Sequence, residues 1–498
     1  MAKLKEPYKF SDFSGGQAND LNPNLVPPQC VEMGMNLDFD SETGSATSRL
    51  GTAIRGAQLV AAMNILGLHQ HVDTVTSSNN KLFAAINAAG GATSVLYDVV
   101  AGNTTAGRTG LTASKKARFL TFLGATLMLN GADAEASYTS AGWITTGGAF
   151  DLGDFPGANK CNLCIVFLDR VYAAGDTSNP ARLYYSGVSA AGAVSWTVGN
   201  GYIDIDVGND NGPITALGKV PGYILIFKER SMTRWNYSSA FPEELVNLGA
   251  SSQESVVMGG GLCAFYSNSN ENDKGFFITN GGRPQPISHD TTRPIKKWID
   301  AITTANEAIM AGFATNHGFA WSIGDVTVDG EAWTNVVLKY NRLLNQWSVR
   351  SYPSEFKVFA RELVSGVNTI VGGDDAGTIF RVDKAGAYSD NGTAIPYRLR
   401  TRAVDMGTNL KKEIADRVVV KGKNLEGATI GAVIDEDRTK IVPLGSSKWW
   451  RTLLQIFGIG KKVEFTSMMI EVLGSTTNAR AVIREVELPS VDVTAEYV

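Results

Sequence analysis

The feature that most constrains this chain is a series of short apolar segments that come in pairs, with a turn of small polar residues inside each pair. The pairs recur from about residue 65 to residue 383. Examples are KLFAAINAAGGATSVLYDVV (81–100), ARFLTFLGATLMLNGAD (117–133) and LCAFYSNSNENDKGFFITN (262–280). Apolar runs of this length, bounded by Gly, Asn, Asp and Ser, predict β-hairpins.

The spacing of these pairs predicts how they assemble. Seven hairpin-like units over about 320 residues give a step near 45 residues, which matches the four-stranded blade of a β-propeller. Many antiparallel hairpins in series leave exposed strand edges, and closing them into a ring removes those edges. We therefore predict an all-β chain with a propeller-like domain of six to eight blades over residues 33–383. A stacked pair of β-sandwiches is the alternative.

Two flanking regions differ from this pattern. Residues 1–32 contain SGGQANDLNPNLVPPQC, whose Gly, Asn and Pro content predicts an extended N-terminal arm without a core of its own. After the polar segment KAGAYSDNGT (384–393) the apolar strands become longer. Residues 384–498 are therefore predicted to form a C-terminal β-sandwich-like module.

One segment inside the propeller region has helical periodicity. Residues 290–309 can begin with a cap at Thr292 and a proline at 294, which suits a first helical turn. Apolar residues follow at helical spacing, namely Ile295, Trp298, Ile299, Ile302 and Ile309. We predict a helical insertion whose apolar stripe packs on a blade.

Composition excludes several classes of protein. The 498 residues carry 45 Lys and Arg against 49 Asp and Glu, and the net charge of −4 does not indicate a nucleic-acid-binding protein. Residues 384–498 have a net charge of +3, which leaves −7 for the remainder. Four cysteines are too few for a disulfide scaffold and fit synthesis in a reducing compartment. The start, MAKLKEPYKF, has no apolar signal core, and no apolar run of about 18 residues predicts a membrane span, so we expect no stable membrane insertion.

The acidic stretch MGMNLDFDSETGSATSRLG (33–51) has the wrong spacing for a calcium loop. If Asp38 were position 1, position 12 would be Arg49, a cation where the motif needs a bidentate glutamate. Leu37 and Phe39 alternate with acidic residues, and Gly44 follows in a turn-forming segment. The stretch therefore predicts a strand, a turn and a second strand.

The sequence gives little support for other catalytic or metal-binding sites. Cys161 and Cys164 could join His69 and His71 around zinc, but a single C-x2-C pair on an apolar strand is more typical of buried packing. The segment GVSAAG (187–192) lacks the second glycine of a nucleophile elbow. No pair of carboxylates stands out for glycosidase chemistry. We predict no catalytic residue, cofactor or metal, and no enzymatic activity.

Two surfaces are candidate contacts with a second subunit or another partner. Arg398, Arg400 and Arg402 alternate along one predicted strand and could follow phosphates or pair with a partner's acids, although a solvated strand face explains them equally well. The segment SSKWWRTLLQIFGIGKK (446–462) gathers apolar residues between basic ones, among them Trp449, Trp450, Leu453 and Phe457. This cluster could be module core, a subunit or partner contact, or a membrane-touching tip.

The N-terminal segment FSGGQANDLNPNLVPPQCVEMGMNLDFDSETGSATSRLG (13–51) resembles the start of tail nozzle, or packaged-DNA stabilisation, proteins of short-tailed bacteriophages. The shared features are Phe and two glycines, a proline-bearing stretch, N-x-D-F-D, and an arginine followed by glycine. Here Arg49 and Gly51 are separated by Leu50. Three later segments, 179–217, 339–349 and 389–407, resemble two blades and the crossover into the C-terminal module.

The resemblance implies a subunit of a virion tail that is assembled in the host cytoplasm and forms a ring with itself, with a hexamer as the expected size. The ring would attach below the portal and its adaptor, contact other tail proteins, retain packaged double-stranded DNA and open for ejection. No catalytic residue accompanies the resemblance. We further hypothesise that the acidic propeller region suits a channel in which DNA slides, because cations would bind phosphates. The alternative is a receptor-binding or carbohydrate-active tail protein.

Overall fold

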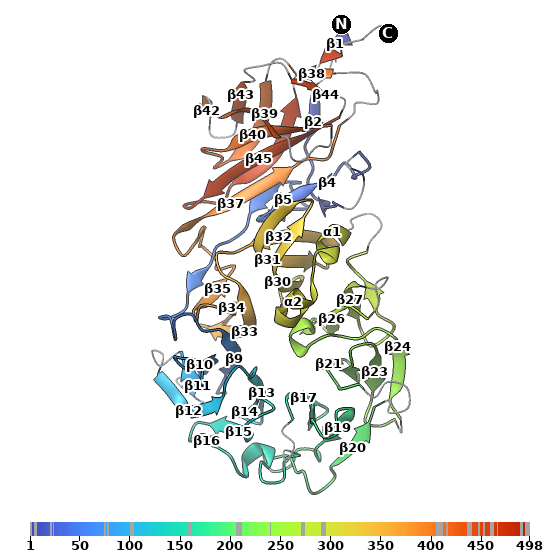
Figure 1. Ribbon diagram of the computed structural model, residues 1–498, viewed down its shortest axis with the longest axis vertical. Helices are drawn as coiled ribbons and strands as arrows, with labels where there is room; N and C mark the ends of the chain where they lie inside the picture. The colour runs from blue at the N-terminus through green and yellow to red at the C-terminus, as the bar shows by residue number, and fades with distance from the viewer. Residues whose placement is uncertain are drawn as a thin grey trace.

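The computed structural model places a β-propeller beside a C-terminal β module (Figure 1). It describes all residues except 1, 4–6, 20–21, 23, 74–75, 77–78, 100–103, 157–160, 206–211, 240, 270–273, 290–294, 405–411, 415–416, 436–440, 447–448, 452–453, 459–462, 466, 489–491 and 494–498.

Within the described residues the propeller has seven four-stranded antiparallel blades; six are separate sheets, and blade 6 forms one end of a ten-stranded sheet. Blade 1 is β9–β12 (Ile65–His71, Lys81–Asn87, Thr93–Asp98, Thr104–Thr112), blade 2 is β13–β16 (Arg118–Phe122, Ala125–Leu129, Ala136–Thr139, Gly142–Ile144) and blade 3 is β17–β20 (Leu163–Phe167, Arg170–Ala174, Arg182–Tyr185, Gly201–Asp204). Blade 4 is β21–β24 (Ala216–Val220, Tyr223–Phe227, Met232–Trp235, Glu243–Val246) and blade 5 is β25–β28 (Val257–Gly259, Leu262–Ser267, Gly275–Thr279, Gln285–Pro286). Blade 6 is β29–β32 (Ala311–Ala314, Gly318–Val328, Glu331–Asn341, Gln346–Ser351), and blade 7 is β33–β35 (Phe356–Val364, Val367–Asp374, Ile379–Val382) with β8 (Ala53–Ile54).

The ring closes on itself through the N-terminal segment. Strand β8 supplies the fourth strand of blade 7 and pairs with β35, with Ile54 opposite Phe380 and Ala53 opposite Arg381. The first strands of successive blades touch one another from β9 through β13, β17, β21, β25, β29 and β33 back to β9. The chain is therefore a closed propeller, as the recurrent hairpins predicted, and not a pair of stacked sandwiches.

The propeller core lies between neighbouring blades. One cluster joins Leu163 and Tyr172 of blade 3 to Ile224 of blade 4, and another joins Phe227 of blade 4 to Phe265 of blade 5. Because side chains alternate across a strand, each blade can pack against both of its neighbours. This explains why these strands are apolar over nearly their whole length.

The C-terminal module is a sandwich of two sheets. One sheet has the order β5-β37-β45-β40-β41 and continues blade 6, while the other has the order β42-β43-β39-β46-β7-β6, with β2 also paired to β46. The strands of the first sheet are β5 (Met33–Met35), β37 (Thr393–Arg400), β45 (Met468–Thr476), β40 (Thr429–Ile434) and β41 (Ile441–Ser446). Those of the second are β42 (Trp449–Arg451), β43 (Leu454–Gly458), β39 (Arg417–Lys423), β46 (Val482–Leu488), β7 (Ala46–Ser48), β6 (Leu37–Phe39) and β2 (Tyr8–Phe10).

Smaller elements complete this end of the molecule. A four-stranded sheet combines β1 (Ala2–Lys3), β47 (Asp492–Val493), β38 (Lys412–Ile414) and β44 (Val463–Phe465), so the two ends of the chain lie together. Strands β3 (Gly16–Gln17) and β4 (Cys30–Val31) pair in parallel, and β36 (Ser389–Asp390) pairs with β37. Two 3-10 turns, Gly148–Phe150 and Gln253–Ser255, lie in the links between blades.

The N-terminal segment belongs mainly to the module. Strand β5 lies between β32 of blade 6 and β37 of the module, so a single ten-stranded sheet runs from the propeller into the module. Residues 33–48, which the sequence assigned to the propeller, pair mainly with module strands, although β5 also pairs with β32 of blade 6. The arm also contributes core, since Phe10 and Phe13 pack with Leu399 and Ile470. These residues are apolar because both sheets of the sandwich need them to fill their common core.

The helical insertion consists of two short helices, α1 (Lys296–Asp300) and α2 (Thr304–Ile309). Thr303 begins the second helix with a reciprocal capping box to Asn306, which interrupts the single helix expected from periodicity. The predicted cap Thr292 and the proline at 294 lie outside the described residues. The apolar stripe is buried against blades 5 and 6, as predicted, with Trp298 fully enclosed.

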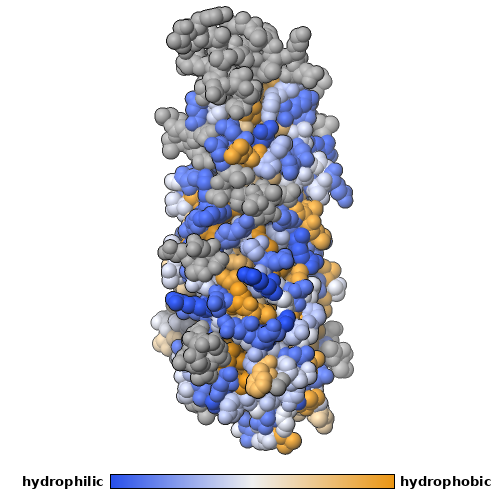
Figure 2. All heavy atoms as spheres, turned by 90° about the vertical axis from the view of Figure 1, so that its right-hand side faces the viewer, coloured by the Kyte–Doolittle hydropathy of each residue, from blue (hydrophilic) through white to orange (hydrophobic). Residues whose placement is uncertain are grey.

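Figure 2 looks at the side of the molecule that is on the right of Figure 1, and it shows a long narrow outline. Hydrophobic residues on that side gather at mid-height, with hydrophilic residues around them. Among the described helices, none has the length and apolar character needed to cross a bilayer.

Candidate functional site

The hairpin formed by β6 and β7 joins the propeller to the module. It has the strand–turn–strand form predicted for residues 33–51, with Leu37 opposite Ser48. Just before it, Asn36 takes a left-handed backbone conformation, φ 57°, that few residues other than Gly and Asn adopt. The Asn36 side chain donates to the carbonyl of Pro396 in the module at 2.8 Å and accepts from the backbone N–H of Ser351 in blade 6 at 2.8 Å.

Arg49, at the end of the same hairpin, is completely buried and fully hydrogen-bonded. It makes a bidentate ion pair with Asp390 at 2.9 and 2.6 Å. It also donates to Asn36 at 2.9 Å and to the carbonyl of Ser351 at 2.7 Å, and its guanidinium lies 4.1 Å from the ring centroid of Tyr352. Such planar, bidentate pairing is specific to arginine, so Arg49 fixes the angle between blade 6 and the start of the module.

Asp38 anchors a second contact, which we call the Asp38 cluster. Its carboxylate meets Arg350 of blade 6 at 2.5 Å and Arg480 of the module at 3.0 Å, with Lys339 at 3.6 Å. Arg350 in turn pairs with Asp383 at 2.5 Å. Burial would raise the pKa of Asp38, but the three cations outweigh it and hold the pKa below its usual range. The cluster is therefore ionised and ties both parts of the chain together.

The Arg400 cluster is centred on β37, in the sheet that continues blade 6. Arg400, 1% exposed, contacts Glu471 at 2.8 Å, Glu32 at 3.3 Å and Glu331 at 3.3 Å. Arg398 pairs with Glu331 and Glu471, each at 2.5 Å. Glu32 comes from the arm, Glu331 from blade 6 and Glu471 from the module. Three separate segments are thus held by two guanidinium groups.

This arrangement changes the interpretation of the predicted arginine ladder. Arg398 and Arg400 are neither a solvated strand face nor a row of free cations, because their ion pairs lie within the chain. Arg402 is half-buried and donates to the hydroxyl of Tyr8. Sequence periodicity correctly placed Arg398 and Arg400 on one face of β37, but Arg402 lies beyond the end of that strand. The pattern could not identify the carboxylates, which come from positions 32, 331 and 471.

The apolar segment 446–462 lies only partly within the described structure. Trp449 and Trp450 belong to β42, and Phe457 belongs to β43, whose backbone pairs with both β42 and β39. Leu453 lies outside the described residues, as do the side chains of the other three. A role for this segment in subunit contacts stays a prediction.

The histidines and cysteines considered for zinc are engaged separately. His69 lies 2.6 Å from the Thr121 hydroxyl and His71 lies 2.9 Å from that of Thr126. The Cys161 thiol donates to the carbonyl of Pro156. Across the described residues, no three His, Cys, Asp or Glu side chains gather closely enough to hold a metal ion.

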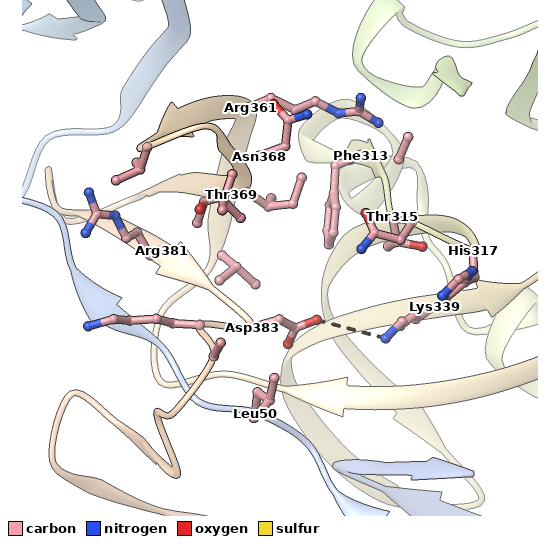
Figure 3. Close-up of a pocket in the computed structure, with 18 of the residues that line it drawn as sticks. Leu50, Phe313, Thr315, His317, Lys339, Arg361, Asn368, Thr369, Arg381 and Asp383 are labelled. Carbon is pink, nitrogen blue, oxygen red and sulfur yellow. Dashed lines mark ion pairs between the residues drawn. The ribbon is translucent and has the colours of Figure 1, made fainter. Parts of the chain in front are cut away.

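A cleft of about 490 Å³ opens between blades 6 and 7 (Figure 3). Phe313, Ile370 and Val382 supply its apolar wall. Arg361 and Asn368 lie on one side of the opening, and Thr315 and His317 on another. Lys339 and Asp383 lie across from Arg361, with 3.9 Å between the ammonium and the carboxylate.

No family model matches this chain, and no curated protein matches it. Similar solved structures include the WD40 domain of Neurospora crassa Pan2, which is 8% identical, with 70% of this chain and 98% of that chain covered and a TM-score of 0.37. The computationally designed Ika8 protein is 11% identical over 66% of this chain and 100% of that chain, with a TM-score of 0.36. The AfRom2 CNH domain is 9% identical over 67% and 99%, with a TM-score of 0.36. At such TM-scores the likeness carries no weight, so the propeller assignment rests on the strand order and the closed ring of contacts.

Proposed function

We propose that this chain is a structural tail protein of a short-tailed bacteriophage, a nozzle subunit that forms a ring below the portal and adaptor. The ring would retain packaged double-stranded DNA and serve as its conduit during ejection. The proposal begins from the N-terminal resemblance over residues 13–51.

The observation that carries the proposal is what those N-terminal residues do. Asn36, Asp38 and Arg49, all within the resembling segment, make the contacts that lock the propeller to the module. Gly51 belongs to the same joint, because a Cβ there would collide with the backbone carbonyl of Ser389. Residues of the resembling segment that hold two parts of the chain rigidly together suit a mechanical component better than an enzyme.

A conduit under load needs subunits that keep their shape. The continuous sheet from blade 6 to the module transmits force through backbone hydrogen bonds, and the buried ion pairs resist rotation between the two parts. Strand β8 joins the N-terminal segment to blade 7, so the propeller of each chain cannot open between blades 7 and 1 without first releasing that segment.

Electron cryo-microscopy of intact particles provides the direct test. The expected result is axial density at the tail in which six copies of this chain form a ring around DNA. Peripheral trimeric spikes would overturn the nozzle proposal and favour receptor binding. Release of reducing sugar from host polysaccharide by the purified chain would favour a carbohydrate-active protein.

A variant test addresses the subunit contact. Replacing Trp449 and Trp450 by Ser is expected to reduce ring assembly, measured by mass photometry of the purified chain. The control replaces Tyr202, an exposed aromatic residue on the outer strand of blade 3, by Ser. Unchanged assembly of the double variant would remove the 446–462 segment from the interface while leaving the nozzle proposal to the particle images.

A further inference from the structure

The cleft between blades 6 and 7 is lined by many hydrogen-bond donors and, among the described residues, by no unpaired carboxylate. In the part of the chain that the structure describes, six of its polar side chains make no intrachain hydrogen bond or ion pair. They are Thr315, Asn316, His317, Arg361, Asn368 and Thr369. Side chains at the tips of adjacent blades thus converge on one opening without satisfying one another.

Among the described residues that line the cleft, Asp383 is the one carboxylate, and it is already paired. Both oxygens of Asp383 lie 2.5 Å from a guanidinium nitrogen of Arg350, and the hydroxyl of Tyr352 lies 3.4 Å away. Burial would raise the pKa of Asp383, yet Arg350 and Lys339 lower it overall, so it stays ionised. Asp383 is therefore held mainly by the buried arginine, with Lys339 as its more distant cation, and it offers no charge to Arg361.

Two cations face the cavity with donors to spare. Arg361 is exposed and has no ion-pair partner among the described residues. Lys339 lies 3.6 Å from Asp38 and 3.9 Å from Asp383, distances longer than direct hydrogen bonds. Arg381 also lines the cleft, but it pairs with Glu362 and its guanidinium points away from the cavity. Lys384 lines the cleft as well and forms no ion pair among the described residues, so the local excess of positive charge rests on Arg361 and Lys384, while Lys339 keeps N–H donors that make no direct hydrogen bond.

We propose that this cleft binds a small oxyanion, a phosphate- or carboxylate-bearing molecule, with Arg361 and Lys339 as the charged donors. The amides and hydroxyls named above supply further hydrogen bonds to its oxygens. The apolar wall at Phe313 accepts the non-polar part of the molecule. The volume of about 490 Å³ lies in the range of sites for small ligands. This inference rests on the cleft alone and is independent of the nozzle proposal.

Isothermal titration of the full chain at constant ionic strength tests it, with pyrophosphate, adenosine monophosphate and citrate as probes. Saturable binding of at least one probe is expected. A probe that carries phosphate and outcompetes citrate identifies a phosphate site, and the reverse identifies a carboxylate site. Absence of saturable binding by all three probes would overturn the proposal, as would binding of duplex DNA alone.

Two variants separate the cleft from general charge. Arg361→Gln is expected to weaken the best probe by at least tenfold, because one charge-assisted hydrogen bond is lost. Arg230→Gln makes the same charge change in an exposed turn of blade 4, remote from the cleft, and should leave affinity within twofold. Equal affinities for both variants and the original chain would refute the site. Because Arg361 has no intrachain partner, its variant should unfold at the same denaturant concentration as the original.

Discussion

Replacement of Arg400 by Met provides a quantitative test of the joint between propeller and module. Arg400 is 1% exposed, and its carboxylate partners Glu32 and Glu471 are completely buried. Met fills similar volume but carries no charge. Glu471 would keep Arg398 at 2.5 Å, whereas Glu32 would lose its arginine. Removing one partner of a buried ion pair costs about 3–5 kcal/mol, because the remaining charge stays desolvated.

The assay is equilibrium urea unfolding followed by tryptophan fluorescence, with the free energy of the first transition compared between variants. Arg182→Met is the matched control, because Arg182 pairs with Asp204 at 2.7 Å on the surface, where the carboxylate side chain is 39% exposed. Its expected cost is below about 1 kcal/mol. If Arg400→Met cost no more than this control, the cluster would not hold the two parts together.

A second variant isolates the cause. In Arg400→Met combined with Glu32→Gln, the buried carboxylate that has lost its ion pair with Arg400 is also removed, so the double variant should be more stable than Arg400→Met alone. If the two substitutions simply added their costs, loss of packing rather than of charge compensation would explain the single variant.

Three further predictions concern other parts of the chain. Gly51→Ala should destabilise the protein by about 1–3 kcal/mol and speed its proteolysis, because the new Cβ meets backbone, whereas Gly153→Ala has open space and should change stability little. Burial, with a smaller contribution from a neighbouring histidine, lowers the pKa of His69 to about 4 from 6.5. Because His69 is protonated at a higher pH in the unfolded chain than in the folded chain, the unfolding free energy should fall as the pH is lowered from 6.5 to 4, by at most about 3 kcal/mol. His69→Gln should flatten that dependence. Burial raises the pKa of Cys263 to about 12, so Ellman's reagent at pH 8 should leave this thiol unmodified until urea unfolds the chain; prompt reaction of Cys263 in the folded protein would contradict its burial.

The strand patterns were readable in sequence because a hairpin is local. Segments such as 117–133 contain both strands and their turn, with Gly124 at φ +72° between β13 and β14. The blade spacing followed from the same local units, and the structure has seven blades, within the predicted six to eight. Propeller closure was an inference from edge energetics, and strand β8 supplies it.

The division of the chain was harder to predict. Nothing local in Met33–Met35 indicates that this strand lies between blade 6 and a strand some 360 residues later. Periodicity likewise read Asp38 as one of several alternating acids, although it meets Arg350 and Arg480 from two different parts of the fold. Such contacts depend on which distant segments share a sheet, and a local pattern carries no information about that choice.

By itself, the sequence determined an all-β chain of repeated hairpins with a longer-stranded C-terminal region, because alternation and turn chemistry act over a few residues. Only the tertiary structure decided which charged side chains form ion pairs within the chain and which remain available to a ligand. Arg400 is paired with buried carboxylates, while Arg361, the same residue type, has no ion pair among the described residues and lies at the mouth of a cleft. The physical reason is that burial and pairing are set by distant neighbours, and these determine whether a cation holds the fold together or can bind a ligand.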